Sequence, residues 1–300
     1  MRVFVTGSTG FIGSAVVGEL HDAGHEVLGL VRSDAGAEAL AKAGAEVHRG
    51  SLDDLDSLRA GAEGVDGVIH TAYTHDFADM AAAAAVDLAA VEAIGSVLVG
   101  SGRPFVIASG TGALQPDRAS VETDMGDPTD PRSPRMRSEL SILDLAERGV
   151  RSSAVRLPPS VHGEGDVHGL VPRLIQIARS AGVSAYPGDG LNHWPAVHRL
   201  DAARVFRLAL EKGEAGRMFH AVGDEGVEVR GIAEVIGRHV GVPVSSVPRG
   251  EPAIEHFGWL GAFFGTDVRA SSALTQEWLG WKPCGLGLLD DLELGHYFKS

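Results

Sequence analysis

Short apolar runs alternate with longer, mixed stretches through the first half of the chain. The runs are nearly continuous, as expected for strands buried on both faces of a sheet, and they cover 3–6, 26–31, 45–48, 65–72, 104–109 and 151–157. The stretches between them are rich in helix formers and predict helices over 11–23, 35–43, 55–60, 80–100 and 134–148. This regular alternation predicts an α/β fold with a doubly wound parallel sheet.

The second half is less regular, with Gly, Pro and aromatic clusters between helices predicted over 171–181, 200–212 and 231–240. We therefore expect a domain of residues 1–157 and a smaller domain of residues 158–300, partly interleaved with the first. Ser133 and Pro134 suit the N-cap and first turn of the helix they precede. The polar, acidic stretch 115–132 predicts an exposed loop before that helix.

Gly7, Gly10 and Gly13 lie between the first predicted strand and the first predicted helix. Gly7 permits a tight turn, Gly10 lets the backbone approach a pyrophosphate, and Gly13 lets the helix pack close to the sheet. The helix N-terminus adds free N–H groups and a partial positive charge for the phosphates. The motif predicts a dinucleotide-binding site. The other residues of the segment expected to line it are Thr9, Phe11 and Ile12.

The end of the second predicted strand bears on the choice of dinucleotide. An NAD site usually places an acidic residue there for the ribose 2′-hydroxyl, whereas this chain has Arg32 and Ser33, with Asp34 expected to start the next turn. A guanidinium makes paired, charge-assisted hydrogen bonds with a phosphate. NADP is therefore the favoured cofactor and NAD the alternative. If Arg32 is simply solvated on a loop, it does not distinguish between the two cofactors.

Composition narrows the class of protein further. The chain has 26 basic and 40 acidic residues, a net charge of −14, and Cys284 as its one cysteine. We expect no intramolecular disulfide, no cysteine-based metal site, no nucleic-acid or membrane partner and a cytoplasmic location. The histidines show no metal-binding spacing, so we also expect no metal. The apolar stretch 80–100 contains two acidic residues and predicts a packed helix rather than a membrane span.

Several further segments carry a resemblance to the extended short-chain dehydrogenase/reductase superfamily, in the branch with nucleotide-sugar epimerases and dihydroflavonol reductases. Residues 6–13 match its Thr-Gly-x-x-Gly-x-x-Gly pattern, and the other similar segments are 49–54, 68–72, 107–111, 156–163 and 188–201. The resemblance implies a Rossmann-type N-terminal domain and a smaller C-terminal substrate-binding domain. It also implies cofactor contacts from Ser51, Leu52, Thr71, Ala72, Pro158 and Pro159, with Ser51 standing where the family usually has Asp.

One departure from this family dominates. Its catalytic Tyr-x-x-x-Lys pair should lie near residues 133–137, where this chain reads Ser-Pro-Arg-Met-Arg. The chain has three tyrosines, at positions 73, 186 and 297, and none is followed four residues later by lysine. The chain therefore resembles the atypical subgroup without the pair. Loss of a general acid typically costs about 10²–10⁴-fold in rate, so the proton needs another source.

Four residues are candidates for the catalytic work. The resemblance places Ser109 and Thr111 where the family has its active-site Ser or Thr, and their hydroxyls could orient a substrate oxygen. Tyr73 closely follows a strand and could supply the only nearby phenol. Arg137 lies near the position of the missing lysine, but it cannot shuttle protons at neutral pH. Each also has a structural alternative: strand-end hydrogen bonding for the hydroxyls, packing for Tyr73 and solvation for Arg137.

The second half offers candidates for the substrate pocket. His162 and His193 could titrate near neutral pH, and Trp194 supplies a large apolar surface in the same loop as His193. We expect these three residues to line a pocket for a small molecule. Core packing is the alternative for each.

Three functions follow from these patterns. The first is an NADP-dependent oxidoreductase that transfers hydride to or from a small carbonyl, enol or imine-like metabolite with a non-standard proton donor. The second is a redox-inactive NAD(P)-binding sensor or partner-binding protein. The third is a nucleotide-sugar epimerase or dehydratase. The resemblance also implies a homodimer formed through helices such as 80–100 and 134–149, and the alanine-rich face of this chain is compatible with it.

Overall fold

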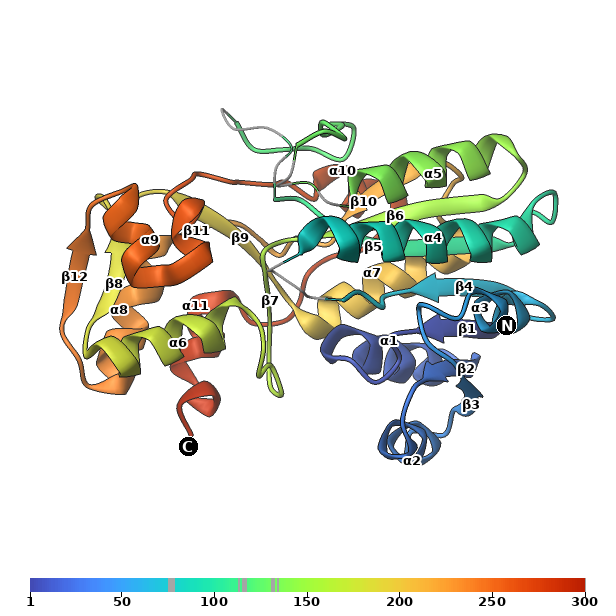
Figure 1. Ribbon diagram of the computed structural model, residues 1–300, viewed down its shortest axis with the longest axis horizontal. Coiled ribbons are helices and arrows are strands. Elements are labelled where there is room, and N and C mark those ends of the chain that lie inside the picture. Colours follow the sequence, from blue (N-terminus) through green and yellow to red (C-terminus); the bar gives the residue numbers. More distant parts are fainter. Residues whose placement is uncertain (75–78, 113, 115–117, 131–132, 134, 300) are drawn as a thin grey trace.

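The computed structural model describes residues 1–74, 79–112, 114, 118–130, 133 and 135–299, which form two lobes (Figure 1). The strands are β1 (Arg2–Thr6), β2 (Glu26–Val31), β3 (Glu46–Arg49), β4 (Gly67–His70), β5 (Pro104–Gly110), β6 (Arg151–Leu157), β7 (Ser160–His162), β8 (Ser184–Pro187), β9 (His193–His198), β10 (Arg217–His220), β11 (Asp224–Glu228) and β12 (Val244–Val247). The helices are α1 (Phe11–Asp22), α2 (Asp34–Lys42), α3 (Leu55–Ala62), α4 (Met80–Leu98), α5 (Met136–Glu147), α6 (Leu170–Ala181), α7 (Arg199–Lys212), α8 (Val229–Val240), α9 (Glu251–Phe257), α10 (Ala273–Leu279) and α11 (Leu288–Glu293), with 3₁₀ turns at Gly258–Ala262 and His296–Phe298.

The larger lobe is built on a seven-stranded sheet in the order β10-β6-β5-β4-β1-β2-β3. Every pairing in this sheet is parallel. The predicted α/β fold with a parallel, doubly wound sheet is therefore confirmed. Because parallel strands point the same way, the ends of β1, β2, β4, β5 and β6 share one edge, and this edge faces the smaller lobe (Figure 1).

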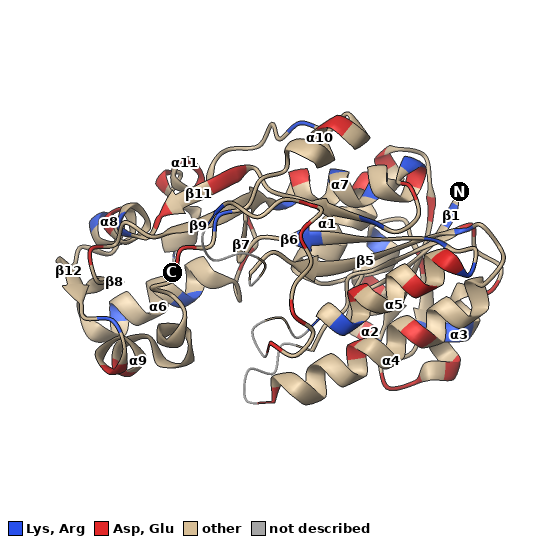
Figure 2. Cartoon of the chain, turned by 90° about the horizontal axis from the view of Figure 1, so that it is seen from above, with Lys and Arg blue, Asp and Glu red and all other residues tan. Residues whose placement is uncertain are grey.

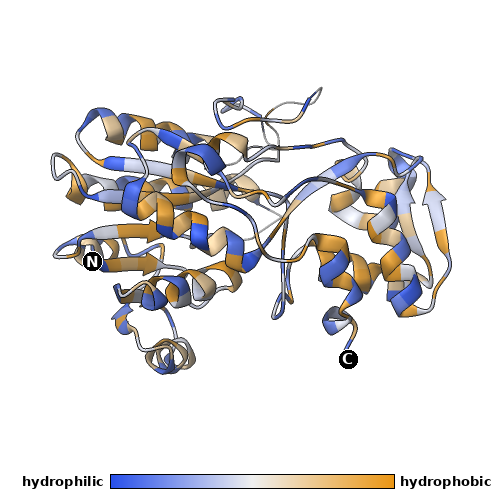
Figure 3. Ribbon diagram, turned by 180° about the vertical axis from the view of Figure 1, so that it is seen from behind, coloured by the Kyte–Doolittle hydropathy of each residue, from blue (hydrophilic) through white to orange (hydrophobic). Residues whose placement is uncertain are grey.

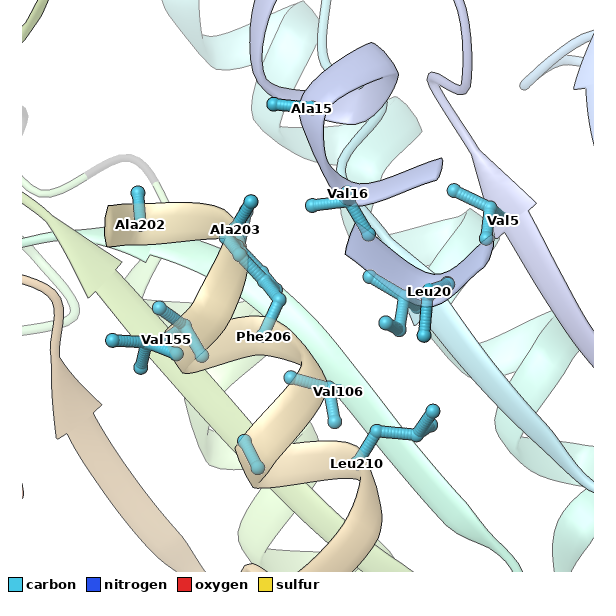
Figure 4. Close-up of a cluster of buried hydrophobic side chains, with 14 of the residues drawn as sticks. Val5, Ala15, Val16, Leu20, Val106, Val155, Ala202, Ala203, Phe206 and Leu210 are labelled. Atoms are coloured by element: carbon cyan, nitrogen blue, oxygen red, sulfur yellow. The ribbon is translucent and has the colours of Figure 1, made fainter. Parts of the chain in front are cut away.

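Helices cover both faces of the main sheet. Helices α1 and α7 pack together on one face, where their apolar side chains form a core with the strands (Figure 4). Helices α3, α4 and α5 cover the other face through a second apolar cluster that includes Phe4, Phe105 and Ile107. The inner strands of this sheet, β1, β2, β4 and β5, are largely hydrophobic (Figure 3), which follows from their burial on both faces. The edge strand β3 is polar and mostly exposed.

The smaller lobe has its own core. A three-stranded sheet in the order β11-β9-β7 and a parallel pair of β8 and β12 are covered by α6, α8, α9 and α11. Strand β10 and helix α7 follow parts of this lobe in sequence but belong to the main sheet and its helical layer. The chain therefore crosses between the lobes several times, and the junction lies next to the edge where the main strands end.

The sequence pattern located most elements of the larger lobe. The predicted helices 171–181, 200–212 and 231–240 also correspond to α6, α7 and α8. The predicted capping by Ser133 is wrong, because α5 begins at Met136 with Arg135 at the N-cap and no side-chain cap. Pro134 and parts of the expected loop 115–132 lie outside the described residues.

Helix α4 is long and apolar enough to cross a membrane by length and composition alone. In the structure it packs between α3 and α5, with Ala90, Val91 and Ile94 fully buried. Its single charged residue on the buried face, Asp87, is ion-paired. The structure thus places this helix in the protein core, as its composition predicted.

Candidate active site

The glycine motif forms a tight turn between β1 and α1. Gly7 has φ +68°, and a Cβ built on it would lie 2.7 Å from the Ala72 nitrogen and 2.8 Å from Thr71 Oγ1. A Cβ on Gly13 would lie 2.0 Å from the Gly7 carbonyl oxygen, so α1 approaches the turn as closely as its backbone allows. The Gly10 N–H donates to the Gly7 carbonyl at 2.9 Å. Gly7 and Gly13 are therefore required by the geometry of the turn, whereas a Cβ on Gly10 would meet only the Gly7 carbonyl oxygen, at 3.2 Å.

The first turn of α1 is suited to an anion. Its N-cap, Gly10, has no side chain to accept a hydrogen bond, and the turn holds no acidic residue. Thr9 is exposed, while Phe11 and Ile12 are partly exposed on the same turn. Backbone N–H groups at a helix N-terminus and the helix dipole favour phosphate. The residues present fit a dinucleotide pyrophosphate.

Two arginines lie at the ends of neighbouring strands beyond this turn. Arg32 directly follows β2 and is exposed, and Arg49 ends β3 opposite Val31. The Asp34 carboxylate accepts a 2.5 Å hydrogen bond from Arg49, so this acid is engaged with a cation. The Ser33 hydroxyl oxygen caps α2 by accepting from the Gly36 N–H. This end of the site is consequently basic.

The predicted contacts at the other strand ends lie along the same edge. Thr71 Oγ1 donates to the Thr6 carbonyl at 2.8 Å, and the Ala72 N–H donates to Thr6 Oγ1 at 3.3 Å, so this strand end is fixed to β1. Ser51 and Leu52 follow β3 and are partly exposed. The structure brings these residues to the edge that the resemblance indicated.

Strands β5 and β6 end beside each other and carry the hydroxyl candidates. The Thr111 N–H donates to the Leu157 carbonyl at 3.0 Å, directly before Pro158 and Pro159. Ser109 is 6% exposed and Thr111 is 4% exposed. Among the described residues, Thr111 Oγ1 is buried without a hydrogen-bond partner. A buried hydroxyl with unused capacity at a strand end can orient a ligand oxygen.

A buried polar network extends from β1 across β4 to α4 and α5. Thr6 Oγ1 and His70 Nδ1 are 2.8 Å apart, and His70 Nε2 lies 3.3 Å from Asp87 Oδ1. Arg135 reaches Asp87 through Nη2 at 2.6 Å and Nε at 3.2 Å, and Ser138 Oγ donates to Asp87 Oδ2 at 2.6 Å. Burial alone would raise the pKa of Asp87, but Arg135, His70 and Ser138 together lower it to about 2.

This network places an arginine against Tyr73. The Arg135 guanidinium carbon lies 4.8 Å from the centroid of the Tyr73 ring. Burial raises the pKa of Tyr73, with Arg135 opposing the change and Asp87 adding to it. Arg137, the predicted substitute for the missing lysine, is exposed, and Arg135 takes the inward position. Helical periodicity explains the difference, because residues two apart point to different sides of a helix.

The sequence pattern did not indicate a role for Asp87 or Arg135 at the site. One signal for Asp87 was available, namely a carboxylate among the alanines of an apolar helix. A charge at such a position is rarely buried unless it is paired. No local pattern distinguishes Arg135 from Arg137.

The predicted pocket residues of the smaller lobe have structural surroundings. His162 is fully buried, and its Nδ1 lies 2.9 Å from Asp291 Oδ2. His193 is partly exposed, with Nδ1 3.0 Å from Asp267 Oδ1. Trp194 is only 4% exposed and packs in the lobe's core, where its indole N–H donates to the Thr266 carbonyl. Trp194 thus occupies a core-packing position, which was the alternative to a pocket wall.

A fully buried ion pair supports the strand ends from behind. Arg156 Nη2 donates to Glu139 Oε2 at 2.6 Å and Arg156 Nε to Oε1 at 2.9 Å, with both side chains fully buried. Arg156 Nη1 also donates to the Asp124 carbonyl at 2.7 Å. The ion pair connects α5 to β6, and the hydrogen bond to Asp124 connects both to the loop before α5.

A cavity of about 280 Å³ lies in the smaller lobe, apart from the glycine turn. Its lining residues are Asp166, Val167, Pro172, Ile175, Gln176, Arg179, Ser180 and Tyr297. Among the described residues, no group of three or more His, Cys, Asp or Glu side chains is arranged to hold a metal ion.

A parallel sheet with a glycine turn, an uncapped helix N-terminus and a hydroxyl-bearing strand edge defines the dinucleotide-binding class of α/β proteins. Residues 3–222 match the model of the NAD dependent epimerase/dehydratase family, and the chain belongs to this family. Members of this family bind NAD or NADP.

Three known proteins illustrate the range of its relatives. An uncharacterized protein of Schizosaccharomyces pombe is 49% identical, covering 99% of this chain and 100% of its own length. A 4-hydroxy-2-methyl-3-oxo-4-farnesyl-3,4-dihydroquinoline-1-oxide ketoreductase of Stigmatella aurantiaca is 25% identical, covering 86% of this chain and 80% of its own length. The structure of a Thermotoga maritima UDP-glucose 4-epimerase with UDP-glucose has a TM-score of 0.78 and 24% identity, covering 99% of this chain and 98% of that one. This last likeness bears on the fold alone.

Proposed function

We propose that this protein is an NADP-dependent oxidoreductase that transfers hydride to or from a small carbonyl, enol or imine-like metabolite. The proposal rests chiefly on the glycine turn, where a Cβ at Gly7 or Gly13 would enter space that the fold uses for close backbone approach. The ketoreductase among its relatives supports the reaction class. Bound NADPH would supply the hydride, and the residues of this chain would bind it, orient the substrate and provide the proton.

The preference for NADP is supported by the charges at the adenosine end. Arg32 is exposed at the end of β2, and Arg49 lies one strand further in an ion pair with Asp34. Both partners of this pair are exposed, and exposed ion pairs are weak, so a phosphate could compete with Asp34 for Arg49. A ribose 2′-phosphate could receive both guanidinium groups and the Ser33 hydroxyl proton. Hydrogen bonds to charged groups contribute about 1.5–3 kcal/mol, so we expect Arg32→Ala to weaken NADPH binding roughly ten- to hundredfold and NADH binding little.

The test is a turnover assay with the purified protein and a panel of ketones, dicarbonyls and imines, followed by NADPH absorbance in both directions. Turnover with NADPH, together with the selective loss in Arg32→Ala, would support the proposal. Lys42→Ala is a matched control, because it removes a cation at the opposite end of α2 from Arg32. Tight NADPH binding with no turnover of any compound would favour the redox-inactive sensor instead.

An epimerase or dehydratase is the second candidate, favoured by the family to which the chain belongs. Such enzymes reuse a bound cofactor within each cycle. Release of stoichiometric NAD from the purified, denatured protein, with interconversion of UDP-glucose and UDP-galactose, would favour it over the oxidoreductase.

We also propose a cytoplasmic homodimer that contacts a small-molecule substrate and neither nucleic acid nor membrane. Basic and acidic residues are interspersed along the helices in the view of Figure 2. Nucleic acid and anionic membrane surfaces are bound by clustered basic residues, so this distribution supports neither as a partner. Sedimentation equilibrium tests the dimer.

A further inference from the structure

The proposed reduction of a carbonyl needs a proton donor at the strand edge. Two of the three tyrosines lie in the smaller lobe, Tyr186 on β8 and Tyr297 in the last 3₁₀ turn. Tyr73 is the tyrosine at the edge of the main sheet. It follows Ala72, whose nitrogen lies 2.7 Å from a Cβ built on Gly7. Tyr73 is therefore attached directly to the wall of the cofactor turn.

Arg135 approaches this tyrosine from a different element, the N-terminus of α5. Its guanidinium packs over the ring at 4.8 Å. Its position is fixed, because Nε and Nη2 both donate to Asp87, which is 1% exposed and also accepts from Ser138. The arrangement gives a phenol and a permanent cation in contact at the strand edge, which are the two properties that the Tyr-x-x-x-Lys pair combines.

We propose that Tyr73 is the proton donor of the reaction and that Arg135 is its positioning residue, held by Asp87. This inference rests on the proposed oxidoreductase function. In the reduction, bound NADPH would supply the hydride for the new C–H bond as the C=O π bond opens. The carbonyl oxygen takes the proton from Tyr73 Oη, whose O–H bond breaks. The carbonyl is reduced, NADPH is oxidised to NADP⁺, and water reprotonates the tyrosinate.

The charges around Tyr73 suit an acid. Among the described residues, Arg135 faces it from α5 and Asp87 from α4, and the two act in opposite directions on its ionisation. A tyrosine is protonated at neutral pH, and burial raises the pKa of Tyr73 further, so the proton is present when the substrate binds. The guanidinium stabilises the tyrosinate formed in the step, since a cation near a phenolate favours its charged form.

The first test compares two tyrosines in matched settings. Tyr186 also packs against an arginine, with the Arg230 guanidinium carbon 5.8 Å from its ring centroid. We expect Tyr73→Phe to lower kcat for a ketone such as diacetyl about 10²–10⁴-fold, while NADPH affinity measured by nicotinamide fluorescence stays unchanged. Tyr186→Phe should remain near wild type. Equal ketone turnover in both variants would overturn the inference.

A second substrate separates acid catalysis from a structural effect. A quaternary iminium salt carries its charge already and needs no proton during hydride transfer. Tyr73→Phe should therefore lose ketone reduction and keep iminium reduction within a few-fold of wild type. Equal losses with both substrates would mean that Tyr73 only shapes the pocket, and the inference would fail.

A third readout does not depend on turnover. The difference in tyrosinate absorbance between wild type and Tyr73→Phe isolates the titration of Tyr73. Because Arg135 opposes the rise in the pKa of Tyr73, Arg135→Met should move this titration to higher pH and Arg135→Lys should largely restore it. An unchanged titration in Arg135→Met would refute the pairing. If wild type binds NADPH but reduces no compound, the proposed function fails as well, whatever the titration shows.

Discussion

Replacing Gly13 with alanine adds one methyl group where α1 comes closest to the cofactor turn. A Cβ at this position lies 2.0 Å from the Gly7 carbonyl oxygen and 2.9 Å from Thr71 Oγ1. Real Cβ atoms essentially never lie within 3.0 Å of such atoms. The Gly7 carbonyl oxygen must therefore move by about 1 Å, which is the difference between the 3.0 Å limit and its 2.0 Å distance from the Cβ.

The magnitude follows from three contributions. Overpacking against backbone costs about 1–3 kcal/mol. Moving the Gly7 carbonyl also weakens its 2.9 Å hydrogen bond from Gly10, which contributes about 0.5–1.5 kcal/mol. Alanine returns up to about 1 kcal/mol of helix propensity. We expect Gly13→Ala to lower the free energy of unfolding by about 1–3 kcal/mol. It should also weaken NADPH binding, because the backbone that faces the pyrophosphate moves with the Gly7 carbonyl.

Urea unfolding and a fluorescence titration with NADPH measure the two effects. Gly18→Ala is the matched control, because Gly18 is exposed on the same helix and a Cβ there meets nothing within 4 Å. This control should be neutral or stabilised by up to about 1 kcal/mol, with unchanged NADPH binding. If Gly13→Ala behaves like Gly18→Ala in both assays, the close packing of α1 on the turn does not control the site.

Three further outcomes are expected. Glu139→Gln leaves the buried Arg156 charge uncompensated and should lower the free energy of unfolding, measured in urea, by about 3–5 kcal/mol. The control Asp144→Asn removes an exposed ion pair and should change this free energy by less than about 1 kcal/mol; similar losses in both variants would contradict the reasoning. Burial, with Arg156 nearby, lowers the pKa of His220 from 6.5 to about 4, so the unfolded state binds more protons between these values. The free energy of unfolding should fall by about 3 kcal/mol as the pH drops through this window, and a pH profile that His220→Asn does not flatten would count against it. Thr111→Val removes a buried hydroxyl that has no hydrogen-bond partner among the described residues, so thermal stability should stay unchanged or rise slightly while KM for the substrate rises. An unchanged KM would exclude substrate contact by this hydroxyl.

The sequence alone determined most elements of the larger lobe, three helices of the second half and the cofactor turn. Strand and helix periodicities are local properties, and three glycines between a strand and a helix specify their geometry through backbone sterics. The end of β2 likewise showed an arginine in place of the usual acid. These features can be predicted from the sequence because each depends on residues that lie close together in the chain.

Only the tertiary structure decided which side chains meet at the strand edge. Asp87 and Arg135 are 48 residues apart, and Arg156 and Glu139 pair across two elements. Choosing Arg135 over Arg137 requires the rotation of α5 about its axis, which is set by packing against α4 and the sheet. The burial of Trp194 could not be predicted from local sequence either, because the side chains packed around it come from distant segments. Contacts between such segments depend on how the whole core packs, so local pattern does not contain them.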